Sequence, residues 1–496
     1  MGLKYIPKVK VTDKHSLSVI YTPGVAAACL KIKDDVMTSF DYTNRENTVG
    51  VFSFEYEKSL KRAEFLKNAL GIDAIPFELS SEKKEDIKVV IENLEPTFAA
   101  VDLLLIENVV SDIDFDVHIP VLKNNVPDLK EFFMCVSKNA FILDLNKLTG
   151  TLGEQSLTLR KNSGGSIESV YTKESHIKPI GVITEGSAVL GLGNIGAFAA
   201  LPVMEGKAVL FSSFADLSAV PICVKEQNPE KFVKIVELIK NSFSAINLED
   251  IAAPTCFQIE KDLDEKCDIP VFHDDAHGTS IVVIAGLLNA LKVAKKNLQD
   301  VKIVMSGAGA AGYTIAKLLI FAGAKNLIVC DREGALSKDN SYVKPNHIEL
   351  SQILNPNNEK GSLKQVIKNA DVFIGVSAPN LLDENDIKNM NEYPIVFALA
   401  NPVPEIMPDV VKKAKKAIIA TGRSDFENQI NNCLAFPGVF KGLLKYGVKK
   451  VTPQIKLNCA KALANCVTDD KLSENYIIPN AMDLSVTQVV ADSINS

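Results

Sequence analysis

Two pairs of adjacent acidic residues are the first feature of this sequence that suggests chemistry. Glu249 and Asp250 follow the apolar run AIN, and Asp274 and Asp275 follow the apolar run IPVF. Because each pair comes near the end of a predicted strand, several hard oxygen ligands can gather there, which suits Mg²⁺ or Mn²⁺. Helix N-capping is the alternative for either pair, since Asp is common at a helix start. The repetition favours a metal site.

A glycine-rich turn carries the spacing of a dinucleotide-binding loop. Gly307, Gly309 and Gly312 follow the apolar run VKIVM, and a helical run, the apolar strand NLIVC and then Asp331 come after them. The first glycine permits a tight turn, the second lets backbone approach a pyrophosphate, and the third allows close packing of a helix whose N-terminal amides face the phosphates. Asp331 lies where a ribose-binding acid is expected. An ordinary strand-to-helix turn is the alternative.

Two further motifs match known spacings but lack the expected context. GLGNIG at 191–196 repeats the glycine spacing, but Pro202 would fall inside the following helix, so we expect a turn on the substrate side. His273 and His277 imitate the spacing of a zinc hydrolase motif, but a strand ends just before them and no glutamate follows the first histidine.

Other polar residues follow apolar runs elsewhere in the chain. Lys207 follows a Glu-Gly turn and precedes AVLF, and Tyr21 follows a strand-like run. Later strands end in Ser377-Ala378-Pro379 and Asn401-Pro402. Taken alone, such residues are more often solvated, packed in a core or part of turns. Ligands of open α/β sheets nevertheless bind beyond the carboxyl ends of strands, where these polar turns fall.

Composition narrows the class of protein. The 496 residues, 47% of them hydrophobic, are enough for more than one core, and the formal net charge of −7 argues against nucleic acid or an anionic membrane as partner. No apolar run approaches the ~20 residues of a membrane helix, and the first residues lack the apolar core of a secretory signal. The nine cysteines are scattered without a C-x-x-C pair, as is typical of reduced packing residues in the cytosol.

A long segment separates two strand-like stretches, TVGVFSFE and PIGVITEG. Residues 56–178 alternate apolar strands with amphipathic helices and contain no cluster of His, Cys or paired acids. We therefore predict a compact inserted α/β module that supplies no catalytic group. Its last part, residues 150–178, is expected to return to the main domain as a loop or hairpin.

A series of stretches, in this order, resembles the malic enzymes, specifically the smaller bacterial-type branch. They are YTPGVA, VLGLGNIG, LPVMEGKAVLF, INLEDIAAP, IPVFHDDAHGT, GAGAAG, FIGVSAP, FALANPVPE, TGRSDFENQINN, AFPG and LSENYIIP. The resemblance covers residues 16–55 and 179 to the C-terminus and offers no counterpart for residues 56–178. Asn194 replaces the more usual aspartate of this family, and Ser187-Ala188 stand where larger malic enzymes carry an arginine.

The resemblance implies a role for each matching residue. The implied metal ligands are the carboxylates Glu249, Asp250 and Asp275. The implied catalytic residues are the base Lys207, the acid Tyr21, and Asp274 beside the base. The implied substrate-binding residues are Asn401 and Asn432. The implied dinucleotide-binding residues are Gly307, Gly309, Ala310, Ala311, Gly312, Asp331, Arg332, Ser377, Ala378 and Asn401.

The implied reaction is oxidative decarboxylation of L-malate to pyruvate and CO₂ with NAD⁺ or NADP⁺ and Mg²⁺ or Mn²⁺. Lys207 would take the C2 hydroxyl proton, and Tyr21 would protonate C3 after CO₂ departs. A malolactic-type enzyme with tightly bound NAD, a non-catalytic nucleotide-binding regulator and a zinc hydrolase are the alternatives. Asp331 favours NAD, whereas Arg332 and Lys338 could meet the extra phosphate of NADP, so the cofactor stays open.

The expected fold class is α/β, with a Rossmann-type doubly wound dinucleotide domain and an α/β catalytic domain that carries the inserted module. We expect the catalytic domain at 1–280, interrupted at about 56–178, and the NAD(P)-binding domain at 281–445. A C-terminal helix and extended tail are expected at 446–496. The expected protein is a cytoplasmic homodimer or higher homo-oligomer that acts on L-malate.

Overall fold

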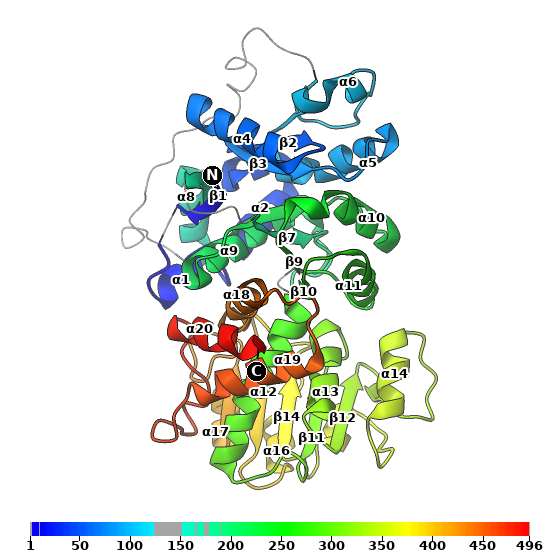
Figure 1. Ribbon diagram of the computed structural model, residues 1–496. Coiled ribbons are helices and arrows are strands. Elements are labelled where there is room, and N and C mark those ends of the chain that lie inside the picture. The colour runs from blue at the N-terminus through cyan, green and yellow to red at the C-terminus, as the bar shows by residue number, and fades with distance from the viewer. Residues whose placement is uncertain are drawn as a thin grey trace. The chain divides into compact units, whose positions relative to one another are not determined.

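The structure is a computed structural model that describes residues 2–8, 10–123, 151–163, 165, 167–172, 178–189 and 191–495 (Figure 1). The chain divides into two compact units. The first unit comprises Met1–Ile251 and Gln258–Phe272, and the second comprises Ala252–Phe257 and His273–Ser496.

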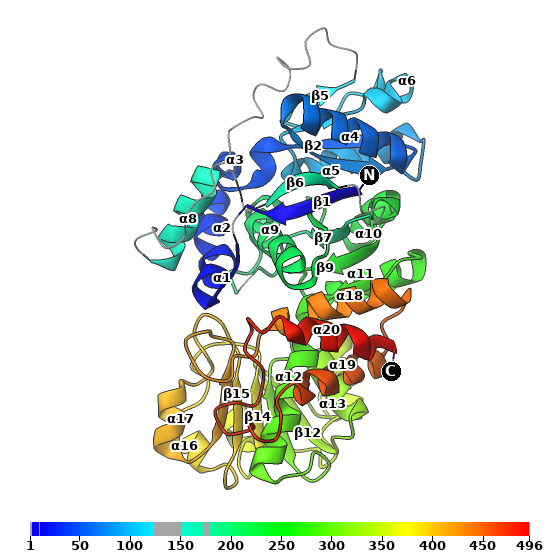
Figure 2. The same cartoon turned by 60° about the vertical axis from the view of Figure 1, so that its left-hand side comes forward.

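Two four-stranded sheets form the frame of the first unit, with strand orders β3-β2-β4-β5 and β10-β9-β7-β8. A two-stranded antiparallel sheet, β1-β6, completes the unit (Figure 2). The strands are β1 (Gly2–Pro7), β2 (Thr48–Ser53), β3 (Asp73–Glu78), β4 (Ala100–Asp102), β5 (Val121–Leu122), β6 (Ile167–Thr172), β7 (Ile180–Thr184), β8 (Ala219–Cys223), β9 (Ala245–Leu248) and β10 (Val271–His273). The helices are α1 (Lys14–Ile20), α2 (Ala26–Asp34), α3 (Ser39–Tyr42), α4 (Tyr56–Leu70), α5 (Lys84–Leu94), α6 (Glu107–Val110), α8 (Leu152–Ser163), α9 (Gly196–Ala215), α10 (Pro229–Ile239) and α11 (Thr255–Lys266).

Local sequence accounts for these elements. In α10, the Asn228 side chain accepts the N–H of Lys231, Pro229 occupies the first turn, and apolar residues recur at helical spacing on the buried face. Strand β7 is buried along its whole length, as expected for a parallel strand covered on both faces.

The second unit is a doubly wound α/β domain. Its six-stranded sheet has the order β13-β12-β11-β14-β15-β16, in which only β13 runs antiparallel to its neighbour. The strands are β11 (Lys302–Ser306), β12 (Asn326–Asp331), β13 (Gly334–Ala335), β14 (Val372–Gly375), β15 (Ile395–Ala398) and β16 (Ile418–Thr421). The helices are α12 (Asp274–Ala294), α13 (Ala310–Phe321), α14 (Pro345–Ile353), α15 (Leu363–Val366), α16 (Glu384–Lys388), α17 (Pro408–Ala414), α18 (Phe436–Tyr446), α19 (Pro453–Asn465) and α20 (Ser485–Asp492).

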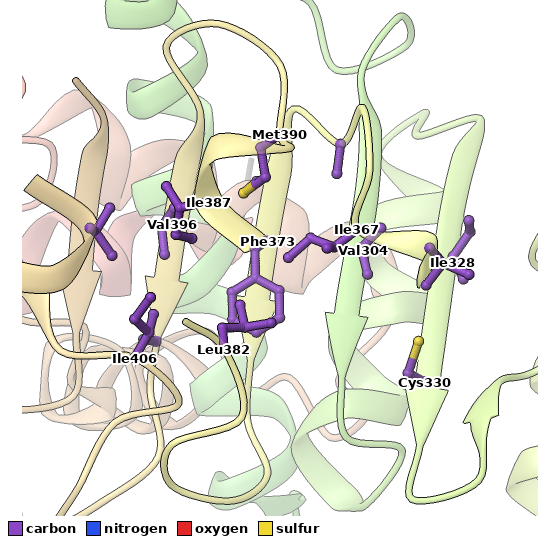
Figure 3. Packing of buried hydrophobic residues seen from close by; sticks show 14 of the residues in the cluster. Val304, Ile328, Cys330, Ile367, Phe373, Leu382, Ile387, Met390, Val396 and Ile406 are labelled. Atoms are coloured by element: carbon purple, nitrogen blue, oxygen red, sulfur yellow. The ribbon is translucent and has the colours of Figure 1, made fainter. Parts of the chain in front are cut away.

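A core of buried apolar side chains covers one face of this sheet. Val304 on β11, Phe373 on β14 and Val396 on β15 pack with Ile387 from α16 and Ile406 from the loop before α17 (Figure 3). The predicted α/β class and the Rossmann-type arrangement are confirmed.

Helices α9 and α12 are each long and apolar enough to cross a membrane by composition alone. However, 83% of the most apolar 18-residue stretch of α9 and 72% of that of α12 are buried within the described structure. That degree of burial is typical of the central helices of a folded domain.

Several local predictions were wrong because an apolar run can form either a strand or a helix. The run before Tyr21 is helix α1, whose capping box joins Asp13 and Ser16. Lys207 lies in the middle of α9, which also runs through Pro202. Since α9 is apolar on all sides and fully packed, tertiary burial outweighs the cost of the proline.

The segment 56–178 also differs from the expected module. Strand β2 was expected to belong to the catalytic domain. It is instead an inner strand of the sheet β3-β2-β4-β5, whose other strands come from the expected module. Residues 150–178, expected to be a loop or hairpin, contain helix α8, which packs on α1 and α2, and strand β6, which pairs with the N-terminal strand β1. In the predicted C-terminal tail, residues 485–492 form α20.

Candidate active site

Lys207 is a buried residue of helix α9 in the first unit. Its side chain is fully buried, and its Nζ is 3.0 Å from Glu249 Oε1, just beyond the end of β9. Asn247 Nδ2 donates to the same carboxylate oxygen at 2.6 Å. A lysine amine that is buried and held in one position by hydrogen bonds can act as a general base or acid toward a bound ligand.

Tyr21 is brought beside Lys207 by a close approach of two helices. It caps the C-terminus of α1, and its ring centroid is 5.4 Å from Lys207 Nζ. A Cβ atom at Gly206 would lie 2.9 Å from the Tyr21 ring and 3.2 Å from the Ile20 carbonyl oxygen, so glycine is needed for this approach. The sequence indicated neither the helix nor this contact.

Asp250 adds a second buried carboxylate after β9. Its backbone is in the left-handed region (φ 55°), and its carbonyl oxygen accepts the N–H of Ala188 at 2.8 Å. Glu249 and Asp250 are thus two adjacent, nearly buried carboxylates, and carboxylate oxygen is the ligand type that a hard divalent cation prefers. Among the residues that the structure describes, no group of three or more His, Cys, Asp or Glu side chains is arranged as a metal site.

The loop between β7 and α9 contains GLGNIG. Its ends are fixed because the Gly186 carbonyl accepts the N–H groups of Ile195 and Gly196, each at 3.1 Å. Glu185, at the start of this loop, is buried, and burial raises its pKa to about 7 although the Ser187 hydroxyl donates to it. The motif is therefore a loop that starts beyond the end of β7.

Arg160, on α8, was missed by sequence reasoning. Its guanidinium is fully buried and donates to Glu205 Oε2 at 3.0 Å, to the Ile20 carbonyl at 3.1 Å and to the Pro202 carbonyl at 3.0 Å. It therefore ties the end of α1, next to Tyr21, to the turn of α9 that precedes Lys207. Nothing in the surrounding sequence distinguishes it from a surface arginine.

In the second unit, Asp274 and Asn432 are in contact. Asn432 Nδ2 donates to Asp274 Oδ2 at 2.5 Å, and the carboxylate is fully buried at the start of α12. A Cβ atom at Gly278 would lie 1.8 Å from Asp274 Oδ1, so the carboxylate occupies the space that this glycine leaves. The sequence predicted both residues but not their hydrogen bond.

The two histidines near Asp274 face different groups. His273 Nε2 is 3.6 Å from Asp275 Oδ2, and Asp275 is partly exposed. His277 Nδ1 is 3.0 Å from Lys456 Nζ. A lysine beside one histidine does not suit a zinc site, in agreement with the poor match of the motif.

The glycine turn of the second unit has the geometry that its spacing predicts. Gly307 has φ 111°, and a Cβ atom there would lie 2.8 Å from the Val376 carbonyl oxygen. At Gly312 a Cβ atom would lie 2.0 Å from the Gly307 carbonyl oxygen. Gly309 caps α13 and has nothing within 4 Å of its Cβ position, which leaves room for a ligand beside it.

Polar contacts join the neighbouring strand ends. Ser306 and Ser377 share a hydrogen bond of 2.8 Å between their hydroxyl groups. Glu405 accepts the N–H groups of Ser377 at 2.9 Å and Ala400 at 3.0 Å, although burial raises its pKa. Asn401 is exposed at the end of β15. The polar turns predicted from the sequence therefore lie at the carboxyl edge of the sheet.

Asp331 ends β12 as predicted. One carboxylate oxygen accepts the N–H of Glu333 at 2.8 Å, and the other is 3.3 Å from His347 Nδ1. Burial lowers the pKa of His347 despite this carboxylate. Arg332 and Lys338 are exposed. Both an acid for a ribose hydroxyl and cations for a phosphate are therefore present.

Comparison with known proteins gives consistent matches. The family model described as "Malic enzyme, NAD binding domain" matches residues 276–495. The model described as "Malic enzyme, N-terminal domain" matches residues 151–264, so it includes the part of the expected insertion that contains Arg160.

Individual relatives agree. The chain is 51% identical to an NAD-dependent malic enzyme of Geobacillus stearothermophilus over 64% of this chain and 66% of that protein. It is 46% identical to a bifunctional malic/malolactic enzyme of Bacillus subtilis over 66% of this chain and 80% of that protein. Among solved structures, a Thermotoga maritima NAD-dependent malic enzyme matches with TM-score 0.62 and 47% identity over 64% of this chain and 84% of that chain.

Proposed function

The chain belongs to the malic enzyme family, and from this premise we propose that it converts L-malate to pyruvate and CO₂ while reducing NAD⁺ or NADP⁺. The Geobacillus stearothermophilus relative is matched over 66% of its length, and the Bacillus subtilis relative over 80%. The observation that carries the proposal is the buried contact of Lys207 with Glu249 beside the ring of Tyr21. This contact joins a base and an acid to a carboxylate that can hold a cation.

The roles of the first unit follow from its contacts. Lys207 takes the proton of the C2 hydroxyl, because Glu249 and the α9 packing fix its Nζ in one place. Tyr21 donates a proton to C3, because the C-terminus of α1 holds its ring beside Lys207. We propose Glu249, Asp250 and Asp275 as the ligands of Mg²⁺ or Mn²⁺. When bound, such a metal would supply Lewis-acid polarisation of the C2 oxygen, and the nicotinamide would supply the hydride acceptor.

The second unit supplies positioning and cofactor binding in this proposal. Asp274, which accepts a hydrogen bond from Asn432, orients the base Lys207 in this proposal. The side chains of Asn401 and Asn432 bind the substrate. The pyrophosphate is held at the turn of Gly307, Gly309, Ala310, Ala311 and Gly312, where the first amides of α13 are exposed to a ligand. The remaining proposed cofactor contacts are Asp331, Arg332, Ser377, Ala378 and Asn401.

The test is an absorbance assay at 340 nm, with malate, Mn²⁺ or Mg²⁺, and each nicotinamide cofactor in turn. We expect malate-dependent reduction that stops when EDTA removes the metal and returns when Mn²⁺ is added. Turnover that persists unchanged in EDTA would remove the metal from the proposal.

A malolactic reaction is the second candidate, because one relative is named a bifunctional malic/malolactic enzyme. Analysis of the products by NMR separates the two reactions. Pyruvate with an equal amount of NAD(P)H supports the main proposal, and lactate without net cofactor reduction supports the second.

We also infer a cytoplasmic homo-oligomer. The cysteines within the described residues are free thiols, and most are buried, which suits a reducing compartment. Sedimentation of the purified protein measures its assembly state directly.

A further inference from the structure

The two four-stranded sheets of the first unit have the same strand order and register. Read from one edge, β3-β2-β4-β5 corresponds to β8-β7-β9-β10. Gly50 on β2 lies opposite Ile75 and Val101. Gly181 on β7 lies opposite Val220 and Ile246, the matching positions of β8 and β9. Either glycine also faces a phenylalanine ring, Phe98 or Phe243, with Cβ distances of 2.9 and 3.2 Å.

Backbone hydrogen bonds outside the strands repeat in the same way. Leu79 donates to the Ser53 carbonyl at 2.8 Å, and Val224 donates to the Thr184 carbonyl at 2.9 Å. Each sheet also has a short 3₁₀ helix before its third strand, Glu95–Thr97 or Lys240–Ser242. The sequences DAIPFEL and SAVPICV, and later HIPVL and DIPVF, align with these equivalent elements.

The contacts between the two sheets are reciprocal. The N–H of Glu78 donates to Ser242 Oγ at 2.9 Å, and the N–H of the equivalent Cys223 donates to Thr97 Oγ1 at 3.0 Å. The equivalent of Thr97 is Ser242, so each half of the contact repeats the other. Such reciprocity is the property of an isologous interface between two copies of one unit.

A second pair of contacts obeys the same rule. Ser80 donates its N–H to the Leu238 carbonyl at 3.0 Å, and Lys225 donates its N–H to the Asn93 carbonyl at 3.0 Å. Lys225 is the equivalent of Ser80, and Leu238 is the equivalent of Asn93. Helices α5 and α10, which carry Asn93 and Leu238, pack against each other.

The first copy lacks the carboxylates proposed for the metal. Asp102 and Asn247 are equivalent, because they lie opposite Val51 and Val182. Two residues further on, Leu104 replaces Glu249, and Leu105 replaces Asp250.

The proposed base is also replaced. Helices α4 and α9 both end at a residue in the left-handed conformation, Gly71 and Asp216. Arg62 precedes Gly71 by as many residues as Lys207 precedes Asp216, so the two side chains are at equivalent positions.

Arg62 Nε is 2.8 Å from Oδ2 of the buried Asp102, which is the equivalent of Asn247 and not of Glu249. The first copy thus keeps the fold and a cation at the position of Lys207, paired with a different carboxylate and without the metal ligands.

We propose that residues 48–122 are an internal copy of the 179–272 unit that acts as a built-in partner without a metal site. They cover, through the isologous contact, the surface that a second copy of the unit would occupy. The absence of a metal site in the first copy rests on the proposed function, whereas the pairing of the copies does not.

The test uses the full chain with two cysteine pairs. Asn93→Cys with Lys225→Cys, and Ser80→Cys with Leu238→Cys, place thiols at the two equivalent contacts. We expect both pairs to close within one chain under mild oxidation, at similar yield, as seen on a non-reducing gel against the wild-type chain as control. Cross-links that join two chains, or closure of only one pair, would overturn the pairing.

An exchange across the interface tests the equivalence of the copies. Thr97→Ser with Ser242→Thr swaps the two hydroxyl acceptors, and Thr97→Val with Ser242→Ala removes both. We expect the exchange to keep Tm within about 2 °C of wild type and the removal to lower it by roughly 5 °C, because the partly buried N–H of Glu78 and the buried N–H of Cys223 lose their acceptors. An exchange that destabilises as much as the removal contradicts the equivalence, whatever the activity of the enzyme.

Discussion

Replacing Arg160 with methionine should destabilise the first unit strongly and disturb catalysis, although Arg160 itself touches no substrate in our proposal. The change removes the donor of the Ile20 and Pro202 carbonyls and the guanidinium that lies 3.0 Å from the fully buried Glu205 carboxylate. Removing one partner of a buried ion pair costs about 3–5 kcal/mol. The free energy of unfolding, measured by urea denaturation, should fall by that amount.

A second substitution distinguishes the effect of the buried Glu205 charge from the effect of the lost packing of Arg160. Glu205 also accepts the N–H of Asn44, so Glu205→Gln in the Arg160→Met background keeps an acceptor for that group and removes the charge. We expect the double variant to regain at least half of the lost stability, since well-packed neutral replacements of buried pairs are often tolerated. A single variant that loses less than about 1 kcal/mol, or a double variant no more stable than the single one, would refute this reasoning.

The kinetic effect should survive that repair. The double variant still lacks the donor to Ile20, which precedes Tyr21, and a shift of about 1 Å in a catalytic group can cost ~10²-fold in rate. We therefore expect kcat of the double variant to stay well below wild type while its KM for malate changes little. Full recovery of kcat together with stability would show that Arg160 has only a structural role.

Three further predictions concern single positions. Tyr21→Phe should slow pyruvate release more than NAD(P)H formation, because C3 is protonated after hydride transfer; equal slowing of both in single-turnover experiments would contradict its role as the acid. Gly312→Ala should lower both Tm and cofactor affinity because its Cβ would lie 2.0 Å from the Gly307 carbonyl oxygen, whereas Gly309→Ala, with open space at its Cβ, should lower only affinity in a fluorescence titration. Burial raises the pKa of Glu185 from its ordinary value of about 4.5 to about 7, so its protonated form stabilises the folded state. That contribution to stability is complete below pH 4.5 and is lost as the pH rises through 7. In Glu185→Gln this pH-dependent decrease of Tm should disappear, and a Tm profile identical to that of wild type would contradict the prediction.

Prediction from the sequence was most accurate for site residues whose type is required by the local backbone. The dinucleotide turn was predicted from Gly307 and Gly312 because each leaves space that another residue would fill, and the acid at Asp331 follows from strand length. The acidic pairs were placed correctly because they directly follow the short buried strands β9 and β10.

The support of the site could not be predicted, because it depends on contacts between distant segments. Lys207 was assigned to a turn before a strand, since an apolar helix buried on every side has no amphipathic period. Arg160 resembles any surface arginine until α8 is packed on α1 and α2. The equivalence of the two sheets is visible in the sequence only as short matches such as DAIPFEL and SAVPICV, and the register of their strands is what makes it recognisable.

The central claim is that Lys207 is the base of a malate-oxidising site, and Lys207→Met tests it most directly. The matched control is Lys67→Met, which removes another lysine of the first unit whose Nζ is 2.6 Å from a buried carboxylate, that of Asp73. Initial rates at 340 nm should fall by roughly 10²- to 10⁴-fold in Lys207→Met and stay within about twofold of wild type in Lys67→Met. A Lys207→Met enzyme that is folded, binds cofactor and oxidises malate at the wild-type rate would contradict the account.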